Sequence, residues 1–260
     1  MKELELTGFR KRLREPGPLF FSIAVVPEPV TASILGHSGV DYVMLDAEHA
    51  PFTLASLHAC VTALKLTPTS VIVRTSSADP VQMAQMADLG VDGVLAPHIE
   101  TAEEAAAVVR AIRFPPEGGR GIGEGMLSTR YGLDEDVFVS RANAGIAAMV
   151  ILESKRGIEN AAEIAAVPGI DAIFVGSADL SGDLGVPGEY RHPEVLAGVD
   201  VAVEQAVAAG LKVFGLSAPR TDAERNAGLV CCATDAIALT AAAAAGLEQA
   251  RASWNGRAEQ

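Results

Sequence analysis

One apolar segment of the sequence ends in three ionisable side chains. The segment DYVMLDAEHAP spans residues 41–51, and Asp46, Glu48 and His49 lie close together near its end. An imidazole titrates near neutral pH, which makes His49 a candidate general base. A lone histidine, however, is more often a structural residue. The segment is therefore either the polar end of an ordinary strand or one part of an active site, depending on what lies beside it.

An arginine and two further carboxylates also stand at the ends of apolar segments. Arg74 ends VIVRT, and its guanidinium suits a substrate carboxylate, although a salt bridge to a nearby acid would explain it equally well. Glu153 closes AAMVILE, and Asp179 follows AIFVGSA. Two carboxylates from neighbouring strands, without cysteine and with a histidine nearby, favour Mg²⁺ or Mn²⁺. Each acid alone is better explained as an exposed loop residue, and the pair leaves both interpretations open.

Three other features carry weaker signals. His98, which directly follows an apolar segment, is expected to line the pocket only. The glycine-rich stretch EGGRGIGEG, residues 117–125, lacks the Lys-Ser/Thr ending of a phosphate-binding loop, and this favours a mobile loop at the mouth of the site. Among the lysines, Lys155 alone lies near the end of such a segment, beside Arg156, which disfavours Schiff-base chemistry.

Short apolar segments alternate with longer helical ones along the chain. Strands are predicted at residues 19–26, 41–47, 70–75, 91–97, 146–153, 171–177, 211–217 and 229–234. Most are continuously apolar, which is typical of parallel strands buried on both faces. Helices are predicted at residues 53–66, 79–90, 101–113, 157–169, 192–210 and 236–254.

This alternation predicts an α/β protein with one (β/α)₈ TIM-barrel domain over residues 1–260, because no Ser-rich or Pro-rich linker divides the chain. A doubly wound open sheet is the alternative. Such a sheet usually carries a glycine-rich fingerprint after its first strand, where this chain has AVVPEPV. Barrels place their active sites at the carboxyl ends of the strands, which is where the ionisable residues stand.

The composition is acidic, with 20 Lys and Arg against 33 Asp and Glu and a formal net charge of −13. Such a protein has no basic footprint for nucleic acid or for an anionic membrane. The three cysteines do not form a disulfide framework. The chain has no continuous apolar stretch of membrane-spanning length, and residues 1–15 have no signal-peptide core, so a soluble cytoplasmic protein is expected.

Several motifs together resemble a known family. LDAEHAP, VIVRT, FPPEGGRGIG and LESKRGIENAAEIAAVPGIDAIFVGSADLSGDLG are similar to the metal-dependent (class II) pyruvate aldolases of the HpcH/HpaI family, which includes hydroxy-oxo-heptanedioate and dehydro-deoxy-glucarate aldolases. The similarity covers nearly the whole chain. It implies a (β/α)₈ barrel in a homo-oligomer, a trimer or hexamer, whose last helix packs on a neighbouring subunit.

The resemblance also implies roles for the candidate residues. Glu153 and Asp179 match ligands of a divalent ion, which would be Mg²⁺, Mn²⁺ or Co²⁺. His49 matches a base that acts through a metal-bound water, and Asp88 matches an acid that pairs with this histidine from an adjacent subunit. Arg74 matches an arginine near the pyruvyl oxygens.

The substrate-binding residues implied are Arg74, Ser177, Ala178 and Asp179, with the backbone amides of the last two holding a pyruvate carboxylate. Some positions depart from the family. Ile151 stands where glutamine is frequent, Ser177 replaces a proline, His98 stands where an apolar residue is more usual, and the loop 123–131 is altered. The metal and pyruvate apparatus thus matches the family, while the aldehyde side of the pocket differs from it.

The expected activity is reversible cleavage of a 4-hydroxy-2-oxo acid to pyruvate and an aldehyde. A related enzyme acting on the same enolate is an alternative, such as a citrate-forming enzyme, a malyl-CoA-like lyase or an oxaloacetate decarboxylase. A CoA substrate would require a basic groove, of which the low number of basic residues gives no sign. A non-catalytic barrel that binds a small oxo acid is a further alternative, favoured only if the metal ligands were absent.

Overall fold

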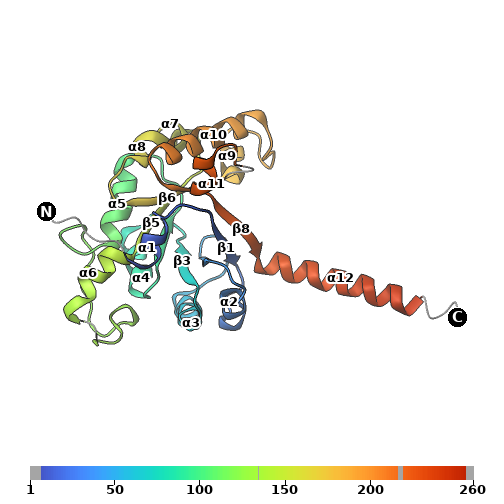
Figure 1. Cartoon of the computed structure of the whole chain (residues 1–260), viewed down its shortest axis with the longest axis horizontal. Helices are drawn as coiled ribbons and strands as arrows, with labels where there is room; N and C mark the ends of the chain where they lie inside the picture. The colour runs from blue at the N-terminus through green and yellow to red at the C-terminus, as the bar shows by residue number, and fades with distance from the viewer. Residues whose placement is uncertain (1–6, 134, 216–218, 256–260) are drawn as a thin grey trace.

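A computed structural model describes residues 7–133, 135–215 and 219–255, and its eight described strands are all parallel (Figure 1). They are β1 Leu19–Ala24, β2 Tyr42–Asp46, β3 Ser70–Arg74, β4 Gly93–Ala96, β5 Ala147–Leu152, β6 Ile170–Val175, β7 Lys212–Phe214 and β8 Leu229–Thr234. β1 to β7 lie side by side in chain order, and β8 pairs with β1. A parallel bridge from Val213 to Gly228 nearly closes the sheet into a barrel.

The predicted barrel is therefore confirmed, and the open doubly wound sheet is wrong because the first and last strands are neighbours. Every predicted strand is present: β8 has the predicted bounds, β6 begins one residue earlier and ends two residues earlier than predicted, and the other strands are shorter. The strand predicted at 211–217 forms β7, and its residues 216 and 217 lie outside the described residues. The assignment of residues 1–260 to one domain stays a prediction, since both ends of the chain also lie outside them.

Helices separate the strands and surround much of the barrel (Figure 1). Their bounds are α1 Gly8–Arg12, α2 Pro29–Gly36, α3 Leu54–Leu64, α4 Pro80–Asp88, α5 Ala102–Ile112, α6 Glu135–Gly145, α7 Lys155–Glu159, α8 Ala161–Ala165, α9 Ser177–Asp183, α10 Pro193–Ala208, α11 Asp222–Ala227 and α12 Asp235–Asn255, with a 3₁₀ turn at Leu127–Thr129. Capping boxes at Thr53 and Thr101 begin α3 and α5. Proline in the first turn begins α2, α4 and α10.

The helix predicted at 157–169 is divided into α7 and α8 at Asn160. The backbone of Asn160 leaves the helical conformation, with φ −95° and ψ 9°. Its side-chain amide donates a hydrogen bond of 2.7 Å to the carbonyl oxygen of Glu100. This link ties the α7–α8 junction to the segment that follows β4.

Two apolar cores explain why the strands are apolar throughout. Val43, Leu45 and Val73 belong to the outer core, between the sheet and the helices. Tyr42 and Met44 alternate with the outer residues of β2 and belong to the inner core, inside the barrel. Burial on both faces removes the polar alternation that a one-sided sheet would show.

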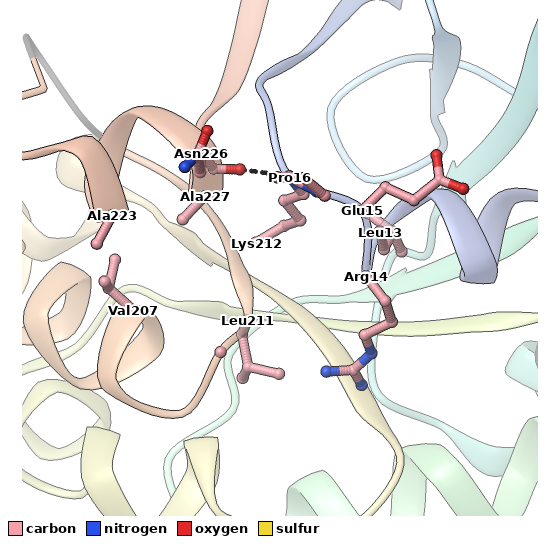
Figure 2. Close-up of a pocket in the computed structure, with 11 residues that line it drawn as sticks. Leu13, Arg14, Glu15, Pro16, Val207, Leu211, Lys212, Ala223, Asn226 and Ala227 are labelled. Atoms are coloured by element: carbon pink, nitrogen blue, oxygen red, sulfur yellow. Dashed lines mark hydrogen bonds between the residues drawn. The ribbon is translucent and has the colours of Figure 1, made fainter.

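The amino-terminal ends of the strands are closed by α1 and a buried ion-pair cluster. The fully buried Asp171 accepts hydrogen bonds from Arg10 and Arg14 at 2.9 to 3.0 Å and from Arg113 at 3.3 Å. Beside it lies a hollow of about 220 Å³ that Leu13, Arg14 and Lys212 help to line (Figure 2). The Lys212 ammonium donates to the carbonyl oxygens of Gly17 and Asn226. These contacts hold the chain together at the end opposite to the candidate site.

The last helix, α12, extends away from the barrel (Figure 1). It is anchored at its first residue, because the Asp235 carboxylate accepts hydrogen bonds from the backbone of Val25 and Val26. Beyond that anchor it exposes Ile237 and Trp254, which are 69% and 81% accessible. Packing of this helix on a neighbouring subunit stays a prediction. None of the described helices combines the length and apolar character needed to cross a membrane.

Candidate active site

A cavity of about 290 Å³ opens at the carboxyl ends of the strands. Its floor is apolar and includes Phe21, Met44 and Phe174 from the inner core. Seven of the residues singled out in the sequence line it: His49, Arg74, Ile151, Glu153, Ser177, Ala178 and Asp179. The fold thus brings together residues that are up to 130 positions apart, as expected for the ends of barrel strands.

Asp46 and Arg74 form a paired unit at the ends of two adjacent strands. The register of β2 and β3 places them side by side, and Arg74 donates two hydrogen bonds of 2.9 and 2.5 Å to Asp46. Asp46 also accepts the backbone N–H groups of Glu48 and His49 at 3.1 and 3.2 Å. Burial raises the pKa of Asp46, but hydrogen bonds and charge from Arg74 outweigh it and leave the pKa below its usual value. Asp46 therefore shapes the turn and aims Arg74.

Glu48 is a largely buried carboxylate whose Oε2 has ion-pair partners but accepts no hydrogen bond from the described residues. Its side chain is 9% exposed. Arg74 Nη1 lies 3.2 Å and His49 Nε2 3.6 Å from that oxygen. Burial raises the pKa of Glu48, against the opposing charges of Arg74, His49 and His98. An unsatisfied buried oxygen of this kind suits a metal ion or a water bound to one.

Glu153 is the most deeply buried acid of the cavity, with a side chain 2% exposed. Its Oε1 accepts the backbone N–H of His98 at 2.8 Å. Burial nevertheless raises its pKa, because desolvation outweighs the contacts with His98. Gly176 at the end of β6 provides the space for this side chain. A Cβ added there would lie 2.6 Å from Glu153 Oε2 and 2.7 Å from its Cβ.

Gly176→Ala is accordingly expected to displace Glu153 and to weaken Mn²⁺ binding roughly 10- to 100-fold, the loss seen when metal ligands lose their support. The backbone of Gly176 suits alanine, with φ −84°, so the effect is steric and local. Calorimetric titration of the metal-free protein with Mn²⁺ measures this loss of affinity. Gly182→Ala in α9 is the matched control, since a Cβ there meets nothing within 4 Å. Equal Mn²⁺ affinities for the two variants would contradict the prediction.

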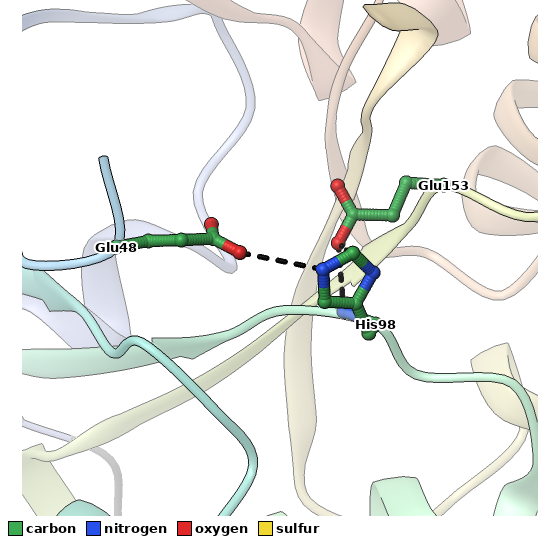
Figure 3. Close-up of side chains that lie close together, drawn as sticks. All are labelled: Glu48, His98 and Glu153. Carbon is green, nitrogen blue, oxygen red and sulfur yellow. Dashed lines mark hydrogen bonds and ion pairs between the residues drawn. The ribbon is translucent and has the colours of Figure 1, made fainter. Parts of the chain in front are cut away.

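His98 has a larger part in this arrangement than the sequence indicated. Its Nδ1 lies 3.0 Å from Glu153 Oε1 and its Nε2 lies 3.5 Å from Glu48 Oε1, so the ring stands between the two carboxylates (Figure 3). Ligand atoms of these three residues lie within 4.8 Å of one another and could hold a metal ion. The sequence signals for His98 were its position directly after a predicted apolar strand and its difference from the apolar residue more usual there in the family.

Asp179 and its neighbours begin α9, directly after β6. Gly176, the residue before the helix, has no side chain to cap the first turn, which leaves backbone N–H groups there for a ligand. Ala178 and Asp179 are exposed and line the cavity. Asp179 lies outside the compact group formed by Glu48, His98 and Glu153. The role of Asp179 as a metal ligand, which the resemblance to the family implies, stays a prediction.

Asp88 lies apart from the other predicted residues, at the end of α4. It accepts hydrogen bonds of 3.0 and 2.5 Å from Arg120, and it lines a different hollow beside α4 and α5. Within this chain it does not line the cavity with His49. The predicted pairing of the two residues across subunits is neither confirmed nor contradicted by a single chain.

Comparison with known proteins relates the chain to one family. A family model described as HpcH/HpaI aldolase/citrate lyase matches residues 22–241. The chain is 38% identical over 231 residues to a hydroxypyruvate/pyruvate aldolase of Delftia acidovorans, covering 88% of this chain and 85% of the relative. It is 36% identical over 181 residues to a 4-hydroxy-2-oxo-heptane-1,7-dioate aldolase of Klebsiella pneumoniae, covering 69% and 68%. A solved HpcH/HpaI family structure from Burkholderia cenocepacia superposes with a TM-score of 0.86 and 31% identity, covering 94% of this chain and 98% of the other.

Proposed function

The chain belongs to the HpcH/HpaI aldolase/citrate lyase family, and from this premise we propose that it is a metal-dependent aldolase. The proposed reaction is the reversible cleavage of a 4-hydroxy-2-oxo acid to pyruvate and an aldehyde. Relatives named as aldolases support the reaction type. The observation that carries the proposal is the cavity in which Arg74, His49 and Glu153 meet the first turn of α9.

The described residues fit a divalent ion. Glu153 and Asp179, which both line the cavity, would hold it, and Glu48 has a carboxylate oxygen within 4.8 Å of one from Glu153. Carboxylate oxygens suit Mg²⁺, Mn²⁺ or Co²⁺. When bound, such an ion supplies Lewis-acid stabilisation of negative charge on the oxo acid.

Arg74 and the start of α9 would bind the oxo acid. Asp46 holds the Arg74 guanidinium by two hydrogen bonds, so its direction is set before substrate arrives. The backbone amides of Ala178 and Asp179, together with Ser177, would receive the carboxylate at a helix start that has no side-chain cap. The apolar floor of Phe21 and Phe174 would keep water from the methyl group of pyruvate.

His49 would move the proton. Its side chain is 57% exposed, so its ring can reach a substrate hydroxyl entering from solvent. During cleavage it takes the proton of the 4-hydroxyl group, and during synthesis it returns that proton to the new alkoxide. Glu48 Oε2 lies 3.6 Å from the Nε2 atom of this ring. We assign Asp88 the role of orienting His49 from an adjacent subunit, within a homo-oligomer that α12 helps to build.

The test is release of pyruvate by the metal-free protein after addition of Mg²⁺, Mn²⁺ or Co²⁺. A panel of 4-hydroxy-2-oxo acids serves as substrate, and pyruvate is measured by its reduction with NADH and lactate dehydrogenase. We expect pyruvate only when an ion is present and loss of activity on chelation. His58→Gln, in an exposed histidine of α3, is the control and retains activity. Absence of pyruvate with every ion and every substrate would reject the proposal.

A further inference from the structure

His98 stands between two buried carboxylates, although its own side chain is 62% exposed. One ring nitrogen lies 3.0 Å from Glu153 Oε1 and the other 3.5 Å from Glu48 Oε1. The two acids are 2% and 9% exposed, so most of their surface is closed to water. The exposed imidazole thus contacts both carboxylates at once.

The backbone at His98 is held in an uncommon conformation. Its φ is +54°, in the left-handed region that few residues other than glycine adopt. Two hydrogen bonds fix this conformation: His98 N–H donates to Glu153 Oε1 at 2.8 Å, and Ile99 N–H donates to the Ile151 carbonyl at 3.1 Å. The surrounding structure thus maintains a conformation that aims the ring at Glu153, and such strain is frequent at functional sites.

We propose that His98 is a nitrogen ligand of the divalent ion assigned above to Glu153 and Asp179, and that Glu48 supplies a further oxygen ligand. This inference rests on the proposed metal-dependent function and extends it to the choice of metal. Ligand bonds of about 2.1 Å place two neighbouring ligands of an octahedral ion roughly 3.0 Å apart. His98 Nδ1 and Glu153 Oε1 lie 3.0 Å apart, which is also an ordinary ion-pair distance, and ligand atoms of His98, Glu153 and Glu48 all lie within 4.8 Å of one another.

A nitrogen ligand changes which ion the site prefers. Imidazole suits Co²⁺, Zn²⁺ and Ni²⁺, whereas Mg²⁺ favours oxygen ligands and retains several waters. The carboxylates alone would favour Mg²⁺ or Mn²⁺. With His98 in the set, Co²⁺ gains affinity relative to Mg²⁺.

The experiment compares His98→Asn with the wild type in metal binding without substrate. Asparagine tolerates positive φ, so the fold is kept, while its side chain is too short to take the place of the imidazole. We expect Co²⁺ affinity to fall at least roughly tenfold, and Mg²⁺ affinity to change less than about threefold. Calorimetry measures both, and the visible absorption of bound Co²⁺ is expected to change. His98→Gln is the second variant, expected to keep Mg²⁺ binding through its amide oxygen without recovering Co²⁺.

Unchanged Co²⁺ affinity and an unchanged Co²⁺ spectrum in both His98 variants would overturn the inference. Normal metal binding with a lower kcat/KM would overturn it too, because His98 would then contact substrate rather than the ion. His58→Gln controls for the loss of an exposed histidine. Because binding is measured without substrate, a wild type that binds Co²⁺ through His98 but releases no pyruvate would reject the proposed function alone.

Discussion

Glu153→Gln is expected to lower metal-dependent turnover by roughly a thousandfold or more, since Lewis-acid stabilisation contributes several kcal/mol to such reactions. The amide has nearly the shape of the carboxylate and its oxygen can still accept the N–H of His98. The loop after β4 thus stays in place, and the loss is assigned to the missing charge. Pyruvate release at saturating Mn²⁺ measures turnover, and calorimetry measures the accompanying loss of Mn²⁺ affinity.

The same variant is expected to be at least as stable as the wild type at neutral pH. Burial raises the pKa of Glu153, so folding disfavours its ionised form. The resulting loss of folding free energy is absent well below the ordinary carboxyl pKa of about 4.3, because Glu153 is then protonated in both the folded and the unfolded protein. The loss grows as pH rises above that value. A neutral amide removes it. Thermal unfolding of the metal-free protein tests this: the variant should be at least as stable as the wild type at pH 7, and any gain in stability should disappear at low pH.

Glu100→Gln is the matched control for Glu153→Gln. Glu100 lies in the same segment after β4, where it accepts a hydrogen bond of 2.6 Å from the Ser154 hydroxyl, but it does not line the cavity. Its substitution should leave turnover within about twofold of the wild type, as surface changes usually do. Comparable turnover in the Glu153 and Glu100 variants, both folded, would contradict the assignment of Glu153 to the ion.

The strands and the grouping of site residues could be predicted because both depend on simple patterns. Continuous apolar segments mark strands buried on two faces, and parallel strands in a barrel end on one rim. Arg74 and Glu153 are far apart in sequence, yet Arg74 ends β3 and Glu153 directly follows β5, and their places at strand ends predict that both lie on the rim of the same cavity. The resemblance to the family added their expected roles.

Other parts of the site depend on tertiary contacts that no local pattern encodes. The aim of His98 follows from a left-handed backbone fixed by Glu153. The need for glycine at 176 follows from the position of that same side chain. Asp88 ends a helix rather than a strand, so the strand-end rule does not place it, and its pairing with Arg120 was not expected. Each of these depends on residues distant in the sequence.

His49→Ala is expected to reduce aldol cleavage by roughly 10²- to 10⁴-fold, the usual contribution of a general base. Decarboxylation of oxaloacetate, which also yields pyruvate, needs no proton removed from a hydroxyl group. Its rate should fall much less, because Arg74 and the carboxylates remain. Both reactions release pyruvate and are followed in one assay, so the ratio of the two losses is independent of protein concentration and of the fraction of metal-loaded enzyme.

The exposure of His49 provides a second readout. Its side chain is 57% exposed and its nearest ionic partner is Glu48 at 3.6 Å, so alanine is expected to leave the fold intact and an open space at the cavity mouth. Imidazole added to the buffer can enter that space and accept the hydroxyl proton, restoring part of the cleavage rate without changing decarboxylation. Rescue should increase with the fraction of neutral imidazole as pH rises through its pKa. Equal losses in the two reactions, with no rescue, would instead assign His49 to binding the oxo acid that both reactions share.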